Sequence, residues 1–286
     1  MVYVLPETTE LGQVELRTGD LSRSLRFYHD LLGLEILEKG PHEAWLAPLQ
    51  GSEPILRLLE IPGAPPQPRH RAGLYHVAFR VPSRVDLARI LRRLLDARWP
   101  FQGFADHLVS EALYLPDPDG NGLEIYRDRP RDTWQRTSHG YAMATLPLDL
   151  EGLLDELQGG EGGPLSPGTV VGHVHLHVGD LEEATKFYEN LGFEVTLRGF
   201  PGAMFLSAGG YHHHIGLNIW AGRNVLPAPK DAAGLESFTI LLPTEDDLQA
   251  LKDHLGLNQG DPFVVDPSGI TVKFGTKGAS GKDGVA

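Results

Sequence analysis

The chain has 286 residues, a formal net charge of −13 and no cysteine. Its length suits two domains of roughly 130 residues, and an acidic chain without a basic stripe argues against a nucleic-acid partner. Without cysteine there is no disulfide or thiolate ligand, so a metal must be held by His, Asp or Glu. Since no apolar run is long enough to cross a membrane and no signal-peptide pattern is present, we expect a soluble, cytoplasmic protein without membrane contact.

Two stretches that lie 160 residues apart repeat one pattern. Residues 11–21 and 171–181 both end in Gly-Asp-Leu, and each is followed by a Phe-Tyr pair and a Leu-Gly pair. Agreement over this length indicates an internal duplication. The copies differ on one face of the expected strand. The first has Gln13, Glu15 and Arg17, and the second has His173, His175 and His177 at the same places.

Each half divides again into two modules with the plan strand, helix and about three strands. The first half, residues 9–130, holds modules one and two, and the second half, residues 169–276, holds modules three and four. Residues 131–168 are Gly- and Pro-rich and predict a linker with a short helix near residues 150–157. Residues 277–286 predict a disordered tail. The fold class is therefore α+β, with four βαβββ modules.

This plan resembles the vicinal oxygen chelate superfamily, which includes glyoxalase I, extradiol dioxygenases and bleomycin-resistance proteins. The residues that carry the resemblance are the two Gly-Asp-Leu and Phe-Tyr landmarks and the segment Asp117-Pro-Asp-Gly-Asn-Gly-Leu-Glu124. Segments 106–114 and 209–218 are most similar to the bacterial two-domain catechol-2,3-dioxygenase type. The resemblance implies two domains, residues 9–130 and 169–276, with cup-shaped half-barrel sheets.

The resemblance also implies where a metal would bind, namely at the start of the first strand and on the last strand of each module. The residues at these positions are Gln13, His76, His173 and Ser237 on first strands, and Glu124 and Lys273 on last strands. In module one the nearest carboxylate is Glu60, and in module three the run of His212, His213 and His214 does not fix an alignment. Lys273 and Ser237 are unsuitable ligands, so module four should contribute none.

Two metal sites can be assembled from these positions, because modules one and two or modules two and three can share a cup. The first pairing gives Gln13, Glu60, His76 and Glu124, which resembles the ligand set of glyoxalase I. The second gives His76, His173 and Glu124, the two-imidazole, one-carboxylate arrangement that leaves positions open on Fe(II). We predict the second set, with Gln13, Glu60 and His214 as alternative ligands.

The main functional hypothesis is a metal-dependent extradiol dioxygenase that acts on a small aromatic substrate of the catechol type with O₂, as in aromatic catabolism. The expected metal is Fe(II), with Mn(II), Ni(II) and Zn(II) as alternatives. His175 and His107 are candidate proton acceptors because imidazole titrates near neutral pH, and Tyr114 is a candidate to hydrogen-bond a phenolate. These three residues are the predicted catalytic groups.

Two other functions are compatible with the sequence. One is a glyoxalase-like metal-dependent isomerase or lyase that uses Gln13, Glu60, His76 and Glu124. The other is a non-catalytic protein that sequesters a small molecule such as an antibiotic in its cups. Paired domains with exposed sheet edges are also compatible with a homodimer.

Overall fold

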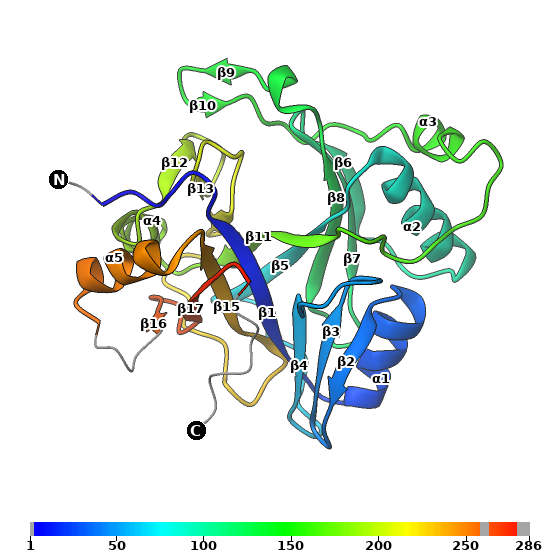
Figure 1. Cartoon of the computed structure of the whole chain (residues 1–286), viewed down its shortest axis with the longest axis horizontal. Helices are drawn as coiled ribbons and strands as arrows, with labels where there is room; N and C mark the ends of the chain where they lie inside the picture. The colour runs from blue at the N-terminus through cyan, green and yellow to red at the C-terminus, as the bar shows by residue number, and fades with distance from the viewer. Residues whose placement is uncertain (1–2, 258–262, 279–286) are drawn as a thin grey trace.

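Two curled β-sheets with helices on their outer faces make up the computed structural model, which describes residues 3–257 and 263–278 (Figure 1). This architecture confirms the α+β class. The sequence predicts a disordered tail over residues 277–286, of which residues 279–286 lie outside the described part of the chain. No helix in the described part of the chain is long and apolar enough to span a membrane.

The first sheet combines modules four and one. Its seven strands lie in the order β16 (Phe263–Val265), β17 (Thr271–Thr276), β15 (Gly234–Leu242), β1 (Glu10–Thr18), β4 (Leu56–Glu60), β3 (Glu43–Ala47) and β2 (Glu35–Lys39). The two modules join through antiparallel pairing of β1 with β15, in which Glu15 lies opposite Ser237.

The second sheet combines modules two and three. Its ten strands lie in the order β6 (Gly103–Asp106), β7 (Ser110–Pro116), β8 (Gly122–Asp128), β5 (Gly73–Arg80), β11 (Val170–His177), β14 (Ile215–Asn218), β13 (Ala203–Ser207), β12 (Glu194–Leu197), β10 (Gly140–Tyr141) and β9 (Arg136–Thr137). Antiparallel pairing of β5 with β11 joins the modules and sets His76 opposite His175.

Each sheet therefore takes one module from each half of the sequence. The repeat in the chain runs over residues 9–130 and 169–276. Neither half builds a cup by itself, because the strand pairs that join the modules are β1–β15 and β5–β11. Of the two pairings that the sequence leaves open, the structure has modules two and three in one cup.

The helices follow the predicted apolar spacing. They are α1 (Leu21–Leu25), which continues as the π-helix η1 (Arg26–Leu31), α2 (Arg84–Asp96), the 3-10 helix η2 (Arg131–Thr133), α3 (Leu150–Asp155), α4 (Leu181–Asn190) and α5 (Glu245–Leu255). Asp180 caps α4 by accepting the backbone N–H groups of Glu182 and Glu183. The buried faces of the helices pack on the apolar sheet residues, including Val174, Leu176 and Val178 of module three.

One repeated contact holds the modules of each sequence half together although they lie in different sheets. The Tyr28 hydroxyl donates to Asp117 at 2.9 Å, and the Tyr188 hydroxyl donates to Asp266 at 3.0 Å. Burial raises the pKa of both Asp117 and Asp266 to about 6. Because the same contact between a helix and a turn occurs in both halves, it agrees with the internal duplication seen in the sequence.

The segment between the halves is more ordered than the linker that the sequence predicts. It contains α3 where the short helix was expected, but also β9 and β10, and Gly140 of β10 pairs with Leu197 of β12. Asp106 and Leu146 exchange backbone hydrogen bonds of 2.9 and 3.0 Å. This interval thus extends the ten-stranded sheet. Its strands have only two residues each, too short to show the alternation by which a strand is recognised.

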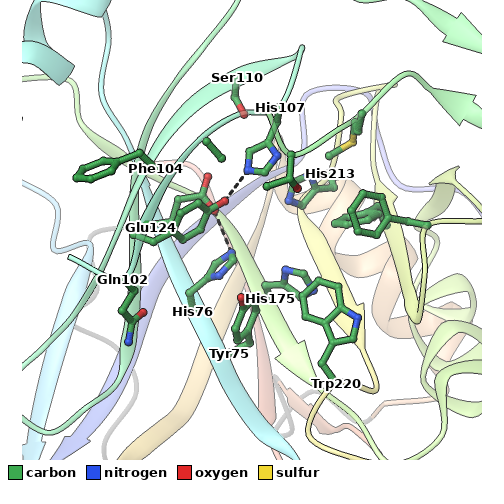
Figure 2. Close-up of a pocket in the computed structure, with 17 residues that line it drawn as sticks. Tyr75, His76, Gln102, Phe104, His107, Ser110, Glu124, His175, His213 and Trp220 are labelled. Carbon is green, nitrogen blue, oxygen red and sulfur yellow. Dashed lines mark hydrogen bonds and ion pairs between the residues drawn. The ribbon is translucent and has the colours of Figure 1, made fainter. Parts of the chain in front are cut away.

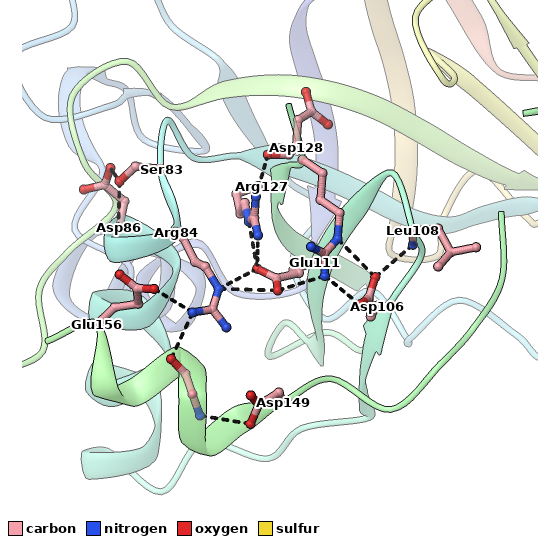
Figure 3. A network of polar contacts seen from close by, with 12 residues as sticks. Ser83, Arg84, Asp86, Asp106, Leu108, Glu111, Arg127, Asp128, Asp149 and Glu156 are labelled. Carbon is pink, nitrogen blue, oxygen red and sulfur yellow. Dashed lines mark hydrogen bonds and ion pairs between the residues drawn. The ribbon is translucent and has the colours of Figure 1, made fainter. Parts of the chain in front are cut away.

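A buried carboxylate fixes α2 and α3 against the outer strands of the ten-stranded sheet (Figure 3). Glu111 on β7 is 3% exposed and accepts from Arg84 at 3.0 Å and from Arg127 at 2.7 Å. Arg129 lies 3.3 Å from its other oxygen. Arg84 also donates to the carbonyl of Gly152 in α3 and to Glu156, which follows α3, so the network links α2 to α3.

We predict that Glu111→Gln lowers the free energy of unfolding by roughly 3 kcal/mol, because three guanidinium groups lose their shared buried anion. Urea denaturation measures this change. The control is Glu182→Gln, which breaks the fully exposed pair with Lys186 and should leave the free energy of unfolding unchanged. Equal effects of the two variants would contradict a structural role for Glu111.

Candidate metal centre

Three buried side chains from neighbouring strands converge inside the cup of the ten-stranded sheet. His76 comes from β5, Glu124 from β8 and His173 from β11, and each is at most 5% exposed. Nε2 of His76 lies 3.0 Å from Oε2 of Glu124, and Nε2 of His173 lies 3.1 Å from the same oxygen. The two Nε2 atoms are 3.3 Å apart. The structure therefore brings together the predicted ligand set.

The spacing and the protonation of this triad suit a divalent cation. Ligand atoms about 2.1 Å from a metal and about 90° apart are separated by about 3.0 Å, close to the three distances above. Burial lowers the pKa of His76 and His173 and outweighs the opposing effect of Glu124. Burial alone would raise the pKa of Glu124, but His173 and His76 hold it well below its usual range. Two neutral imidazoles and one carboxylate result.

His76 and Glu124 of the triad line a cavity of about 270 Å³ (Figure 2). The predicted catalytic residues His175, His107 and Tyr114 all line it. The remaining lining residues are mainly apolar: they include Phe104, Met143, Phe200, Phe205 and Trp220, with Gln102, Ser110 and Thr145 as uncharged polar groups. A metal in the triad would thus lie beside a partly open cavity whose walls are largely aromatic.

His107 and Tyr114 form a hydrogen-bonded pair whose proton positions follow from a third partner. Nδ1 of His107 lies 2.6 Å from the carbonyl oxygen of Ala144, which can only accept, so Nδ1 carries a proton. In neutral His107 the other nitrogen, Nε2, then accepts the Tyr114 hydroxyl at 2.7 Å. Burial, followed by the charge of Glu124, keeps the pKa of Tyr114 well above its usual value. Tyr114 is therefore a protonated donor.

His175 is held as a neutral side chain in the wall of the cavity. It is 4% exposed, and burial, together with His76 and His173, places its pKa well below the usual value. Its Nε2 atom is buried, and no hydrogen-bond partner for it is found among the described residues. At neutral pH His175 thus offers a hydrogen-bonding nitrogen without charge.

The three successive histidines diverge in the structure. His213 lines the cavity, and its ring centroid is 4.1 Å from that of His173. His212 instead bonds Asp128 at 2.9 Å. The alternative ligand His214 accepts the backbone N–H of Ala208 at 3.2 Å, away from the triad. The sequence marks this run as unusual, but His213 could not be chosen from it, because the three residues precede β14 and lack a strand register.

The other two alternative ligands are not near the triad. Gln13 and Glu60 lie on β1 and β4, in the seven-stranded sheet. Glu60 accepts the backbone N–H of Leu21 at 2.9 Å and pairs with His42 at 2.7 Å, so it stabilises the start of α1. The glyoxalase-like set of four ligands is therefore not assembled, because β1 pairs with module four instead of module two.

In the seven-stranded sheet an ion-pair network occupies the place that corresponds to the triad. Glu15 is 5% exposed and accepts from Ser237 at 2.7 Å, Lys273 at 2.9 Å and Arg57 at 3.0 Å. Burial alone would raise the pKa of Glu15, but Lys273 and Ser237 lower it. In the seven-stranded sheet the buried carboxylate is thus neutralised by cationic side chains of the protein itself.

Comparison of the chain with known proteins identifies its family. The model of the Glyoxalase/Bleomycin resistance protein/Dioxygenase superfamily matches residues 10–125 and 170–274, and the chain belongs to this superfamily. It is 46% identical over 254 residues to the catechol-2,3-dioxygenase of Bacillus subtilis strain 168, covering 87% of this chain and 88% of that protein. It is 29% identical over 123 residues to biphenyl-2,3-diol 1,2-dioxygenase 3 of Rhodococcus globerulus, covering 42% of this chain and 64% of that protein.

A solved structure shows the same fold at low sequence identity. Glyoxalase I from Zea mays aligns with a TM-score of 0.55 and 18% identity, over 93% of this chain and 92% of that one. The resemblance to the superfamily that the sequence indicates is confirmed.

We predict that Lys273→Ala lowers the free energy of unfolding by about 1–2 kcal/mol, because buried Glu15 loses a cationic partner that is itself partly exposed. Thermal or urea denaturation measures this. The matched control is Lys277→Ala, whose pair with Glu10 lies at the surface and should cost at most about 0.5 kcal/mol. An unchanged free energy of unfolding in Lys273→Ala would show that the ion pair between Lys273 and Glu15 does not stabilise the fold.

Proposed function

We propose that the protein is a metal-dependent extradiol dioxygenase that opens the ring of a catechol-type substrate with O₂. The observation that carries the proposal is the facial set of His76, His173 and Glu124 at an aromatic-walled cavity. The 46% identity to a catechol-2,3-dioxygenase over most of both chains supports it. Both atoms of O₂ enter the product, so the reaction needs no external reductant.

A metal held by His76, His173 and Glu124 would lie next to the cavity, because His76 and Glu124 line it. Fe(II) held there would supply open positions for the two catechol oxygens and for O₂, and Mn(II), Ni(II) and Zn(II) are the other ions to test. Two neutral imidazoles and one carboxylate give a site of net charge about +1 with a divalent ion. That charge favours an anionic catecholate, and the apolar side chains of the cavity suit its aromatic ring.

Proton movement is assigned to His107 and Tyr114. The substrate hydroxyl gives its proton to the Tyr114 oxygen while the Tyr114 proton passes to Nε2 of His107, and the reverse transfer returns it to the ring-opened product. Ala144 fixes the tautomer of His107 that makes this possible. His175, whose pKa is far below neutrality, is a weak base. We therefore leave the proton transfer to His107 and Tyr114 and place His175 in the cavity wall.

We predict that His76→Ala, His173→Ala and Glu124→Ala each lower iron binding and reduce ring cleavage at least 100-fold, because each removes one of three ligands. Elemental analysis measures the iron after anaerobic loading, and absorbance of the yellow product measures turnover of catechol. Gln13→Ala is the control and should retain both. Iron loss in Gln13→Ala but not in His173→Ala would overturn the assignment of the site.

We predict that Tyr114→Phe and His107→Gln lower kcat by about 100-fold or more, the usual contribution of a positioned proton-transfer group, while KM changes little. Both variants should retain iron, which separates proton transfer from metal binding. The control is Tyr3→Phe, which removes a hydroxyl beside His254, outside the cavity. A normal kcat in both variants would exclude this pair from proton transfer.

A further inference from the structure

We infer that the cavity selects catechols that carry an uncharged substituent and rejects those that carry a carboxylate. This inference rests on the proposed function and deepens it, because it names the substrate class. It follows from three independent properties of the cavity, namely its volume, the chemistry of its walls and the absence of a cation among its lining side chains.

The cavity is larger than an unsubstituted ring needs. An apolar protein cavity of about 150 Å³ can hold one benzene molecule, whereas the cavity beside the triad measures about 270 Å³. A catechol whose two hydroxyls face the triad therefore leaves space for a further group. The excess volume suits an alkyl chain of a few carbons or a small ring.

Apolar side chains from different parts of the fold line this space. Phe104 comes from β6, and Figure 2 shows it on one side of His76 and Glu124, with Trp220 on the other. Phe200 packs edge-on against Phe205 with their ring centroids 5.6 Å apart, and Met143 from the segment between the halves packs on this pair. A substituent placed here would lie against aromatic carbon and a thioether.

The lining side chains offer no counterion for an acidic substituent. None of them, all within the described part of the chain, is Lys or Arg, and the carboxylate among them is Glu124. Arg80 lies on β5 in the same sheet, but it is paired with Asp128 at 3.2 Å and does not line the cavity. A carboxylate on the ring that entered this space would lose hydration without gaining a cationic partner, a penalty that a neutral polar group does not carry.

The test compares two substrates of nearly equal shape, 3,4-dihydroxybenzamide and 3,4-dihydroxybenzoate, with catechol as the reference. We expect kcat/KM of the iron-loaded enzyme to be at least about 100-fold higher for the neutral amide, and 3-propylcatechol to match or exceed catechol. Equal kcat/KM for amide and carboxylate would overturn the inference. Dissociation constants measured anaerobically by calorimetry should show the same preference without turnover.

A matched pair of variants places the charge preference in the cavity. Gln102 lines the cavity and its side chain is exposed, so a substitution there should not disturb folding. Gln102→Arg should raise kcat/KM for 3,4-dihydroxybenzoate at least about tenfold, and Gln102→Glu should not. A failure of Gln102→Arg to favour the carboxylate, in both turnover and affinity, would count against charge as the basis of selection.

The apolar wall is tested separately. Trp220 is 46% exposed, so Trp220→Ala should fold, and it should reduce kcat/KM for 3-propylcatechol several-fold more than for catechol. The control Leu226→Ala truncates a side chain that is 65% exposed and outside the cavity. If no catechol is cleaved at all, the proposed function fails, whereas cleavage without discrimination contradicts only the substrate class.

Discussion

Antiparallel pairing of β5 with β11 is the interaction on which the site depends. It joins strands that are about a hundred residues apart in the chain, and its register sets His76 opposite His175 and Ala78 opposite His173. Parallel pairing of β8 with β5 then brings Glu124 beside Ala78. Three candidate ligand atoms from three adjacent strands meet there, although the β11–β5 ladder has register shifts between Val171 and His173 and between His175 and Leu176. The backbone hydrogen bonds of the sheet, with these irregularities, also position the site.

The two cups have the same strand plan but different buried polar clusters. Both carry a buried carboxylate at the seam between two modules. In one cup Glu124 faces two imidazoles, and in the other Glu15 faces Lys273 and Arg57. Protonated lysine and guanidinium groups satisfy Glu15 directly, whereas Glu124 could instead share a metal cation with its two imidazoles.

Much of the fold and part of the site could be predicted from local pattern. Alternation along β11 predicts His173 and His175 on one face and Val174 on the other. In the structure Val174 packs in the hydrophobic core, while His173 belongs to the triad and His175 lines the cavity. The position of His213 in the wall could not be predicted, because it precedes a strand. Likewise, the carbonyl of Ala144 that orients His107 belongs to a segment whose composition indicates a linker. Its contact depends on that segment pairing with β6, where Leu146 bridges Asp106.

The sequence by itself determined the four modules, their α+β class, the superfamily and the presence of His76, His173 and Glu124 at positions suited to ligands. Only the tertiary structure decided that modules two and three share a cup, which excludes Gln13 and Glu60 from the site. The physical reason is that local periodicity fixes the face on which a side chain lies. Which module pairs with which across their first strands depends instead on the summed burial and hydrogen bonding of whole modules.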